Sequence, residues 1–284
     1  MSGTYDAWIG RSEEATDTVT PRQARQMAAT LGDTCAADPL EDGAILPPLW
    51  HWMGWSPDTP MAGLGIDGHP AKGGFLPPIA LERRMWAGGR LQFHSPLRIG
   101  QPMIRRSEIL KIIEKTGSAG SMVFVTVGHK TYGPDGLAVI EEQDIVYVAM
   151  PTTFTPPPPI AAPAGGVWVE NPAIDTARLF RFSALTFNAH RIHFDLPYAS
   201  DVEKYPGLIV HGPLQAMLLM EAARRHSNRD QPASFQFRGV RPLFHFNKVR
   251  LMAQNPVSDT QSMCTATEEG VICMQADISW RAAE

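Results

Sequence analysis

Cysteine is scarce in this 284-residue chain: only Cys35, Cys264 and Cys273 occur, and no two of them form a C-x-x-C pair. Three cysteines cannot build the disulfide framework of a small secreted protein. The lack of paired cysteines also disfavours a zinc site made of thiolates. We therefore expect a protein of a reducing compartment, the cytoplasm.

Long apolar runs and an excess of positive charge are also missing. No stretch approaches the roughly 18–20 apolar residues of a membrane span, and the N-terminus does not combine a basic with an apolar segment as a signal peptide does. The 25 Lys and Arg residues against 29 Asp and Glu give a net charge of −4, which argues against binding nucleic-acid phosphates. We expect a globular protein with neither membrane nor nucleic acid as partner.

Proline, by contrast, is concentrated in one segment. Residues 151–168 read PTTFTPPPPIAAPAGGVW. Proline fixes φ and lacks an N–H, so this stretch favours an extended linker, although a proline-rich loop within one domain is the alternative. We expect an N-terminal domain over residues 1–150, the linker over 151–168 and a C-terminal domain over 169–284, which suits a chain of about two domains' length.

The regions on either side of this linker resemble each other. LQFHSPL at 91–97 resembles FQFRGVRPL at 235–243, and residues 136–147 resemble residues 270–280. Two similar pairs in the same order indicate an internal duplication.

Each half also shows one helix followed by strands. Pro21–Leu31 is a predicted helix with Thr20 as N-cap and Gly32 as C-cap, and Pro213–His226 has apolar residues at helical spacing. The expected strands are rich in β-branched and aromatic residues: Met122–Tyr132, Leu137–Met150, Lys248–Gln254, Ser262–Thr267 and Val271–Trp280. The sequence therefore predicts an α+β fold made of two helix-plus-antiparallel-sheet units.

The densest group of reactive side chains runs from Phe182 to Gly212 and includes His190, His193 and His211. Gly212 precedes Pro213 and would lie at the helix N-terminus, where free N–H groups can stabilise a negatively charged oxygen. An ordinary glycine at a helix start is the alternative.

The histidines allow more than one interpretation. His193 is either an acid–base group or a packed, hydrogen-bonded histidine. His190 and His193 could together bind a metal on a helix, but no H-E-x-x-H pattern occurs, so we expect neither a metal nor another cofactor. Ser183 lies in no G-x-S-x-G motif, which disfavours a serine nucleophile.

Residues 186–195 (TFNAHRIHFD) and 209–212 (IVHG) resemble the hydratase signature of the MaoC-like hot-dog enzymes. The segment FSALTFNAHRIHFD is most similar to the 3-hydroxyacyl-thioester dehydratase branch, which includes itaconyl-CoA and mesaconyl-C4-CoA hydratases. Residues 46–52 (LPPLWHW) and 68–78, beginning with Gly68-His69-Pro70, resemble the first half of that branch. The resemblance implies a double hot dog in which the N-terminal half is degenerate and helps form the acyl-CoA pocket.

The resemblance also implies reversible hydration of a 2-enoyl thioester, with itaconyl-CoA as the first expectation and mesaconyl-C4-CoA or a general 3-hydroxyacyl thioester as alternatives. The family's catalytic Asp falls on Asn188, and a neutral amide cannot act as a base. We therefore expect His193 to be the base, Asn188 to position the water and Gly212 to bind the thioester oxygen, although His190 could share the base role.

Further residues are candidates for substrate binding, namely Arg191, His190 and His211. Arginines that could meet CoA phosphates are Arg83, Arg84, Arg90, Arg191, Arg238 and Arg241. The tryptophans at 50, 52 and 55 line an acyl pocket or pack in the core. A thioesterase is disfavoured by the motif, whereas a non-catalytic acyl-thioester-binding hot dog is supported by Asn188. Two copies could pair as a homodimer, which the sequence neither requires nor forbids.

Overall fold

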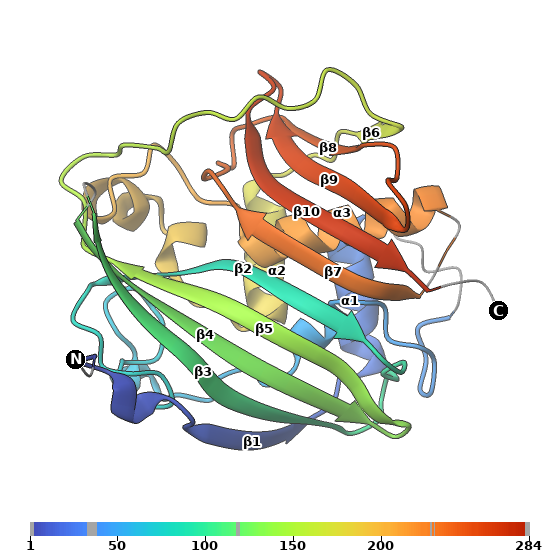
Figure 1. Ribbon diagram of the computed structural model, residues 1–284, viewed down its shortest axis with the longest axis horizontal. Helices are drawn as coiled ribbons and strands as arrows, with labels where there is room; N and C mark the ends of the chain where they lie inside the picture. Colours follow the sequence, from blue (N-terminus) through green and yellow to red (C-terminus); the bar gives the residue numbers. More distant parts are fainter. Residues whose placement is uncertain (1–2, 33–38, 118–119, 228, 230, 282–284) are drawn as a thin grey trace.

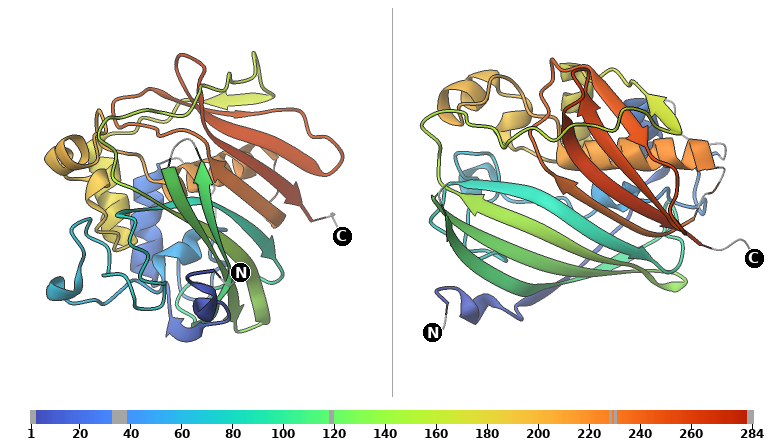
Figure 2. Two further views of the ribbon diagram at one scale, coloured as in Figure 1. Left: turned by 60° about the vertical axis from the view of Figure 1, so that its left-hand side comes forward. Right: turned by 45° about the horizontal axis from the view of Figure 1, so that its top comes forward.

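One ten-stranded antiparallel sheet wraps around three helices (Figure 1). The computed structural model describes residues 3–32, 39–117, 120–227, 229 and 231–281. The strand order is β1-β3-β4-β5-β2-β7-β10-β9-β8-β6. The helices lie together on one side of the sheet, as the turned view in Figure 2 shows.

The N-terminal half forms the first five strands of this order. Its elements are β1 (Ser12–Asp17), α1 (Pro21–Leu31), β2 (Arg83–Phe93), β3 (Met103–Gly117), β4 (Gly120–Gly133) and β5 (Gly136–Val148). Helix α1 begins at a capping box, in which the Thr20 hydroxyl accepts from the Gln23 N–H and the Gln23 side chain accepts from the Thr20 N–H. It ends at Gly32, whose φ of +87° suits glycine.

The C-terminal half forms the other five strands. Its elements are β6 (Trp168–Glu170), α2 (Thr176–Leu185), α3 (Gly212–Ser227), β7 (Pro232–Gly239), β8 (Val249–Ala253), β9 (Thr260–Thr267) and β10 (Ile272–Trp280). From the centre of the sheet outward, the first half runs β2-β5-β4-β3-β1 and the second runs β7-β10-β9-β8-β6. The two halves therefore repeat one strand order, as expected from their similar sequences.

The halves join where β2 pairs with β7, with Leu91 opposite Phe235. A single hydrophobic core continues across this junction and contains nearly all of the apolar side of α3. The buried Trp50 indole of the first half donates to Glu221 on α3, with 3.1 Å between Nε1 and Oε1. The second half's main helix is thus packed against both halves.

The helices and strands expected from the sequence are confirmed, and the structure adds others. The helices at 21–31 and 213–226, the hairpin after residue 120 and the three C-terminal strands all form. Helix α2 and strands β1, β2, β3, β6 and β7 were not predicted from the sequence. Residues 151–167 form no helix or strand, but backbone hydrogen bonds from Ala162 to Gly270 and from Ile272 to Ile160 attach them to the C-terminal half.

Cys264 and Cys273 are buried free thiols, while Cys35 lies outside the described residues. In the described part of the chain, no helix has the length and hydropathy to cross a membrane.

Candidate active site

Four imidazole rings form a row at the junction of the halves. The ring centroids of His69 and His190 are 4.2 Å apart, those of His190 and His193 are 5.4 Å apart, and those of His193 and His211 are 3.6 Å apart. Three of these histidines come from the second half and His69 comes from the first. The row brings together residues separated by more than a hundred positions in the chain.

His193 lies at the end of a short 3-10 helix, Arg191–His193, and is almost completely buried. Its Nδ1 is 2.8 Å from the Ile209 carbonyl oxygen. A carbonyl can only accept, so Nδ1 carries the hydrogen and Nε2 of the neutral ring keeps its lone pair. Burial, reinforced by the neighbouring His211 and His190 rings, holds the pKa of His193 well below its usual 6.5. At neutral pH this residue is an uncharged imidazole with a free acceptor.

His211 connects His193 to the start of α3. Its ring stacks on His193 at an interplanar angle of 21°, and its Nε2 lies 2.9 Å from the Ser183 hydroxyl on α2. The residue is fully buried, and burial lowers its pKa to about 3. This geometry makes His211 a neutral ring that fixes the plane of His193.

Gly212 follows directly and is the first residue of α3, as predicted. The first N–H groups of a helix have no intrahelical partner and lie at the positive end of its dipole. A Cβ on Gly212 would lie 3.8 Å from the Trp86 carbonyl oxygen, so the helix start faces β2 of the other half. His193 therefore lies close to a helix N-terminus across a short stack of one ring.

Asn188 is engaged with the backbone. Its Oδ1 accepts a hydrogen bond of 2.9 Å from the His190 N–H, which holds the turn that precedes the 3-10 helix. His190 itself is buried, with Nε2 3.5 Å from Glu203 Oε1. One acceptor position of Asn188 is thus used for structure, while its amide NH₂ can still donate.

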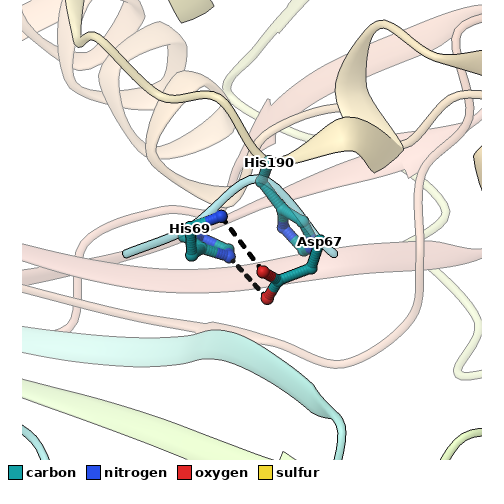
Figure 3. Close-up of side chains that lie close together, drawn as sticks. All are labelled: Asp67, His69 and His190. Atoms are coloured by element: carbon teal, nitrogen blue, oxygen red, sulfur yellow. Dashed lines mark hydrogen bonds and ion pairs between the residues drawn. The ribbon is translucent and has the colours of Figure 1, made fainter. Parts of the chain in front are cut away.

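A loop of the first half reaches this motif and supplies Asp67 and His69. Both the N–H and Nδ1 of His69 lie 3.0 Å from a carboxylate oxygen of Asp67, and His190 approaches the pair from the other half (Figure 3). The Asp67 carbonyl accepts from the Arg191 N–H at 2.9 Å. Gly68 has φ +88°, and a Cβ there would lie 1.9 Å from the Ala189 carbonyl oxygen, so only glycine allows this approach.

The charges in this loop follow from its contacts. The hydrogen bonds and attraction from His69 outweigh desolvation and lower the pKa of Asp67 to about 2, so it is ionised. Burial lowers the pKa of His69 to about 4, against the opposing effect of Asp67. Since Asp67 accepts, His69 Nδ1 carries the hydrogen and its Nε2 keeps a lone pair, as in His193.

Asp67, His69 and His190 are also the one group of three metal-ligating side chains found among the described residues, with ligand atoms all within 4.8 Å of one another. Asp67 already accepts two hydrogen bonds from His69, an arrangement that orients an imidazole. From the sequence, the possible metal-binding pair was His190 and His193, because the sequence does not show that the loop at 67–69 lies beside His190.

The arginines proposed for CoA are all hydrogen-bonded within the protein. Arg191 donates to Asp195 at 2.7 Å and to the Ile66 carbonyl at 3.1 Å, and its side chain remains 37% exposed. The partners of the others are Glu203 for Arg83, the Pro70 carbonyl for Arg84, Glu142 and Asp144 for Arg90, Gln275 for Arg238 and the Pro157 carbonyl for Arg241. Of these contacts, Arg83 to Glu203 and Arg191 to Ile66 join the two halves.

Two of the predicted tryptophans line a cavity of about 170 Å³. Trp52 and Trp55 line it together with Trp86, and Thr186 at the end of α2 is a further lining residue. Arg105 also lines this cavity, and its buried Nε has no hydrogen-bond partner in the described part of the chain. Trp50, by contrast, is buried in the core. A larger cavity of about 680 Å³ lies between residues 171–174 and 245–250, and none of the four histidines of the row lines either cavity.

The structure thus brings five sequence-predicted residues together: Asn188, His190, His193, His211 and Gly212. It adds Asp67 and Glu203, which were not predicted from the sequence, and places His69 at one end of the histidine row. The Gly68-His69-Pro70 motif was the sequence signal for His69, but the family resemblance assigned no role to this motif.

Comparison with known proteins agrees with this architecture. Residues 49–245 match the family model described as hydroxyacyl-thioester dehydratase type 2. A mesaconyl-C(4)-CoA hydratase from Chloroflexus aurantiacus is 46% identical over 278 residues, covering 98% of each chain. A MaoC-like dehydratase from Phytophthora capsici has a similar structure, with TM-score 0.73, 13% identity and coverage of 99% of this chain and 98% of that one.

A Mycobacterium tuberculosis protein described as having a double hotdog fold is also similar, with TM-score 0.57, 14% identity and 95% of each chain covered. The predicted α+β double hot dog is therefore confirmed. With the family match covering the histidine row from His69 to His211, the chain belongs to the hydroxyacyl-thioester dehydratase type 2 family and is a hydro-lyase of the double hot-dog fold.

Proposed function

We propose that this protein adds water reversibly to the double bond of a 2-enoyl-CoA thioester. The observation that carries the proposal is the neutral, buried His193, with Nε2 free to accept a proton, held by His211 beside the Gly212 end of α3. His193 suits proton transfer, and the N–H groups at the Gly212 end of α3 suit the stabilisation of an oxyanion. Acid–base catalysis contributes about 10²–10⁴-fold and one oxyanion donor about 10²–10³-fold.

In this mechanism, His193 Nε2 takes a proton from water while the water oxygen bonds to the β carbon. The electron pair of the double bond moves toward the thioester oxygen, where the Gly212 N–H stabilises the enolate. His193 then returns the proton to the α carbon. Asn188 assists through its amide NH₂, and the full burial of His211 favours a positioning role over the substrate contact expected from sequence.

For the acyl group, we favour a C5 dicarboxylyl-CoA of the mesaconyl-C4 type over itaconyl-CoA. The 46% identical mesaconyl-C(4)-CoA hydratase supports the first. Trp86, whose carbonyl oxygen faces Gly212, lines a small cavity together with Trp52 and Trp55, and the size of this cavity suits a short branched acyl chain. Arg105 in its wall would pair with the free carboxylate of such a substrate.

The division into a degenerate half at 1–150, a linker at 151–168 and a catalytic half at 169–284 remains part of the proposal, with Arg191 and His190 near the substrate. A cytoplasmic location and a homodimer also stay predictions.

The test is a set of CoA thioesters, mesaconyl-C4, itaconyl and crotonyl, mixed with the protein and followed by absorbance and by a thiol reagent. We expect absorbance of the conjugated double bond to fall without release of free CoA, fastest with mesaconyl-C4-CoA. Release of CoA would indicate a thioesterase. Binding without either change would favour the non-catalytic acyl-binding function, which Asn188 in place of a carboxylate supports.

A further inference from the structure

We infer that the N-terminal half supplies a second water-binding group to the hydratase site: His69, oriented by Asp67, accepts a hydrogen bond from the attacking water through Nε2. This inference rests on the proposed function, because it needs a water beside His193.

The need for such a group follows from the acceptors that the C-terminal motif offers. A water molecule has two hydrogens, and His193 Nε2 has a single lone pair, so it can accept only one of them. Asn188 stands where a carboxylate would hold the other hydrogen, and its Oδ1 already accepts from the His190 N–H at 2.9 Å. His190 Nε2 faces Glu203 at 3.5 Å. The motif in residues 186–195 therefore offers the second hydrogen no carboxylate, only neutral acceptors such as the remaining lone pair of Asn188 Oδ1.

His69 has the properties of a stronger acceptor, because a carboxylate bound to one nitrogen of an imidazole makes the other nitrogen more basic. Its Nδ1 hydrogen is fixed on the ionised Asp67 at 3.0 Å, so its lone pair lies on Nε2 at the opposite edge of the ring. Its side chain is 25% exposed, whereas His190 and His193 are buried. An acceptor of defined tautomer is thus accessible to water at the open end of the histidine row.

The position of His69 is fixed by contacts that cross between the halves. The Arg191 N–H donates to the Asp67 carbonyl, the Arg191 guanidinium donates to the Ile66 carbonyl, and Gly68 lies against Ala189 where no Cβ fits. These contacts attach the loop to Ala189 and Arg191, which lie shortly before His193 in the chain. The loop and the motif therefore act as one unit, and the carboxylate that the motif lacks is replaced by Asp67 acting through an imidazole.

In the reaction, His69 exchanges no proton. One water hydrogen passes to His193 Nε2, the other stays on oxygen in a hydrogen bond to His69 Nε2, and the oxygen bonds to the β carbon as the π electrons move to the thioester oxygen. The proton on His193 then goes to the α carbon and the carbonyl forms again. His69 is a catalytic residue because it contacts the water, and Asp67 is a positioning residue.

The experiment compares His69→Ala, Asp67→Asn and the exposed control His94→Ala with the unaltered protein, using the best enoyl-CoA. We expect His69→Ala to lower kcat about a hundredfold with KM within about threefold, and added imidazole to restore part of the rate. Asp67→Asn lowers kcat about tenfold at unchanged KM, because Asn can still accept but holds the tautomer less strongly. His94→Ala leaves both constants unchanged, and thermal melting of each variant checks that it folds.

The outcomes separate this inference from the proposed function. If the unaltered protein hydrates the substrate and His193→Ala does not, but His69→Ala keeps full kcat, the second acceptor is wrong and the hydratase stands. Loss of activity in EDTA with recovery on adding Zn²⁺ would instead make Asp67, His69 and His190 metal ligands and overturn the inference. The inference would also be overturned if His69→Ala melts like the unaltered protein, changes KM but not kcat, and gains no activity from added imidazole.

Discussion

Among single residues, His193 determines whether the proposed chemistry is right. Its Nδ1 is committed to the Ile209 carbonyl, so any substitution that keeps size but loses Nε2 removes the proton acceptor. We predict that His193→Ala lowers kcat by at least about 10²-fold, and that circular dichroism stays unchanged. A variant with near-normal kcat would contradict the assignment.

A substitution at Arg105 tests which acyl group the protein binds, and not which reaction it catalyses. Its unpartnered Nε in the aromatic cavity suits a substrate carboxylate, and losing a hydrogen bond to a charged group costs about 1.5–3 kcal/mol. We predict that Arg105→Met raises KM for mesaconyl-C4-CoA on the order of tenfold to a hundredfold. Crotonyl-CoA, which lacks the carboxylate, is the matched control and should show the same KM with both proteins.

Buried histidines also make stability depend on pH. Burial lowers the pKa of His211 to about 3 and that of His129 to about 4, from 6.5 in the unfolded chain. Below pH 6.5 the unfolded state therefore binds more protons than the folded state, and stability falls as pH decreases toward those folded pKa values. Each group should cost about 1 kcal/mol between roughly pH 7 and pH 5.5, measured by urea unfolding.

His129 provides the control for that slope, because it contacts Ser107 on β3 and lies outside the histidine row. His129→Gln should make stability depend less steeply on pH while leaving kcat intact. An unchanged slope would show that His129 is protonated equally in both states.

At the scale of elements, the loop carrying Gly68 connects the halves at the site. An added Cβ would meet the Ala189 carbonyl oxygen at 1.9 Å, so Gly68→Ala must move either the loop or the motif. We predict a fall in kcat/KM of at least about tenfold together with a loss of about 1 kcal/mol or more in stability.

Gly136, the first residue of β5 after the β4–β5 turn, is the matched control. It has a similar φ of +95° and open space around its Cβ position. Gly136→Ala should lose comparable stability from the backbone strain but keep kcat/KM. Equal losses of activity in both variants would mean that strain, and not contact with Ala189, explains the effect.

The elements also show how far sequence could lead. Local signals were sufficient for α1, whose capping residues lie within the helix and its ends, and for the β4–β5 hairpin around its Gly-Pro-Asp-Gly turn. His190, His193 and His211 lie in one segment of the chain, so the sequence alone was sufficient to identify them as site candidates. The place of His69 in the site depends on contacts between the halves, and that of Glu203 depends on an irregular turn. Neither feature can be predicted from the local periodicity of the sequence. The use of Asn188 Oδ1 by the His190 N–H was likewise hidden, since an Asx turn and a water contact need the same residue type.

For the whole molecule, the joined sheet implies that the proline-rich segment is not what holds the halves together. The pairing of β2 with β7 and the core that α3 shares with Trp50 do that. We predict that a protease site inserted at the exposed Gly165 can be cut without loss of activity, with both fragments eluting as one species in size-exclusion chromatography. Separation of the fragments after cleavage would contradict this. The elution volume of the uncut protein also tests the homodimer.

The approach of Gly68 to Ala189 has a consequence for how such chains can change over time. Two copies of an ancestral unit are normally free to drift apart, one keeping the activity and the other accumulating substitutions. Here a loop of the copy without the signature is fitted, atom against atom, to the signature of the other. Swapping either half for that of a distant homologue should therefore fail unless residues 66–69 and 188–193 are exchanged as a set, so that inheritance of the two halves is coupled even though their sequences have diverged.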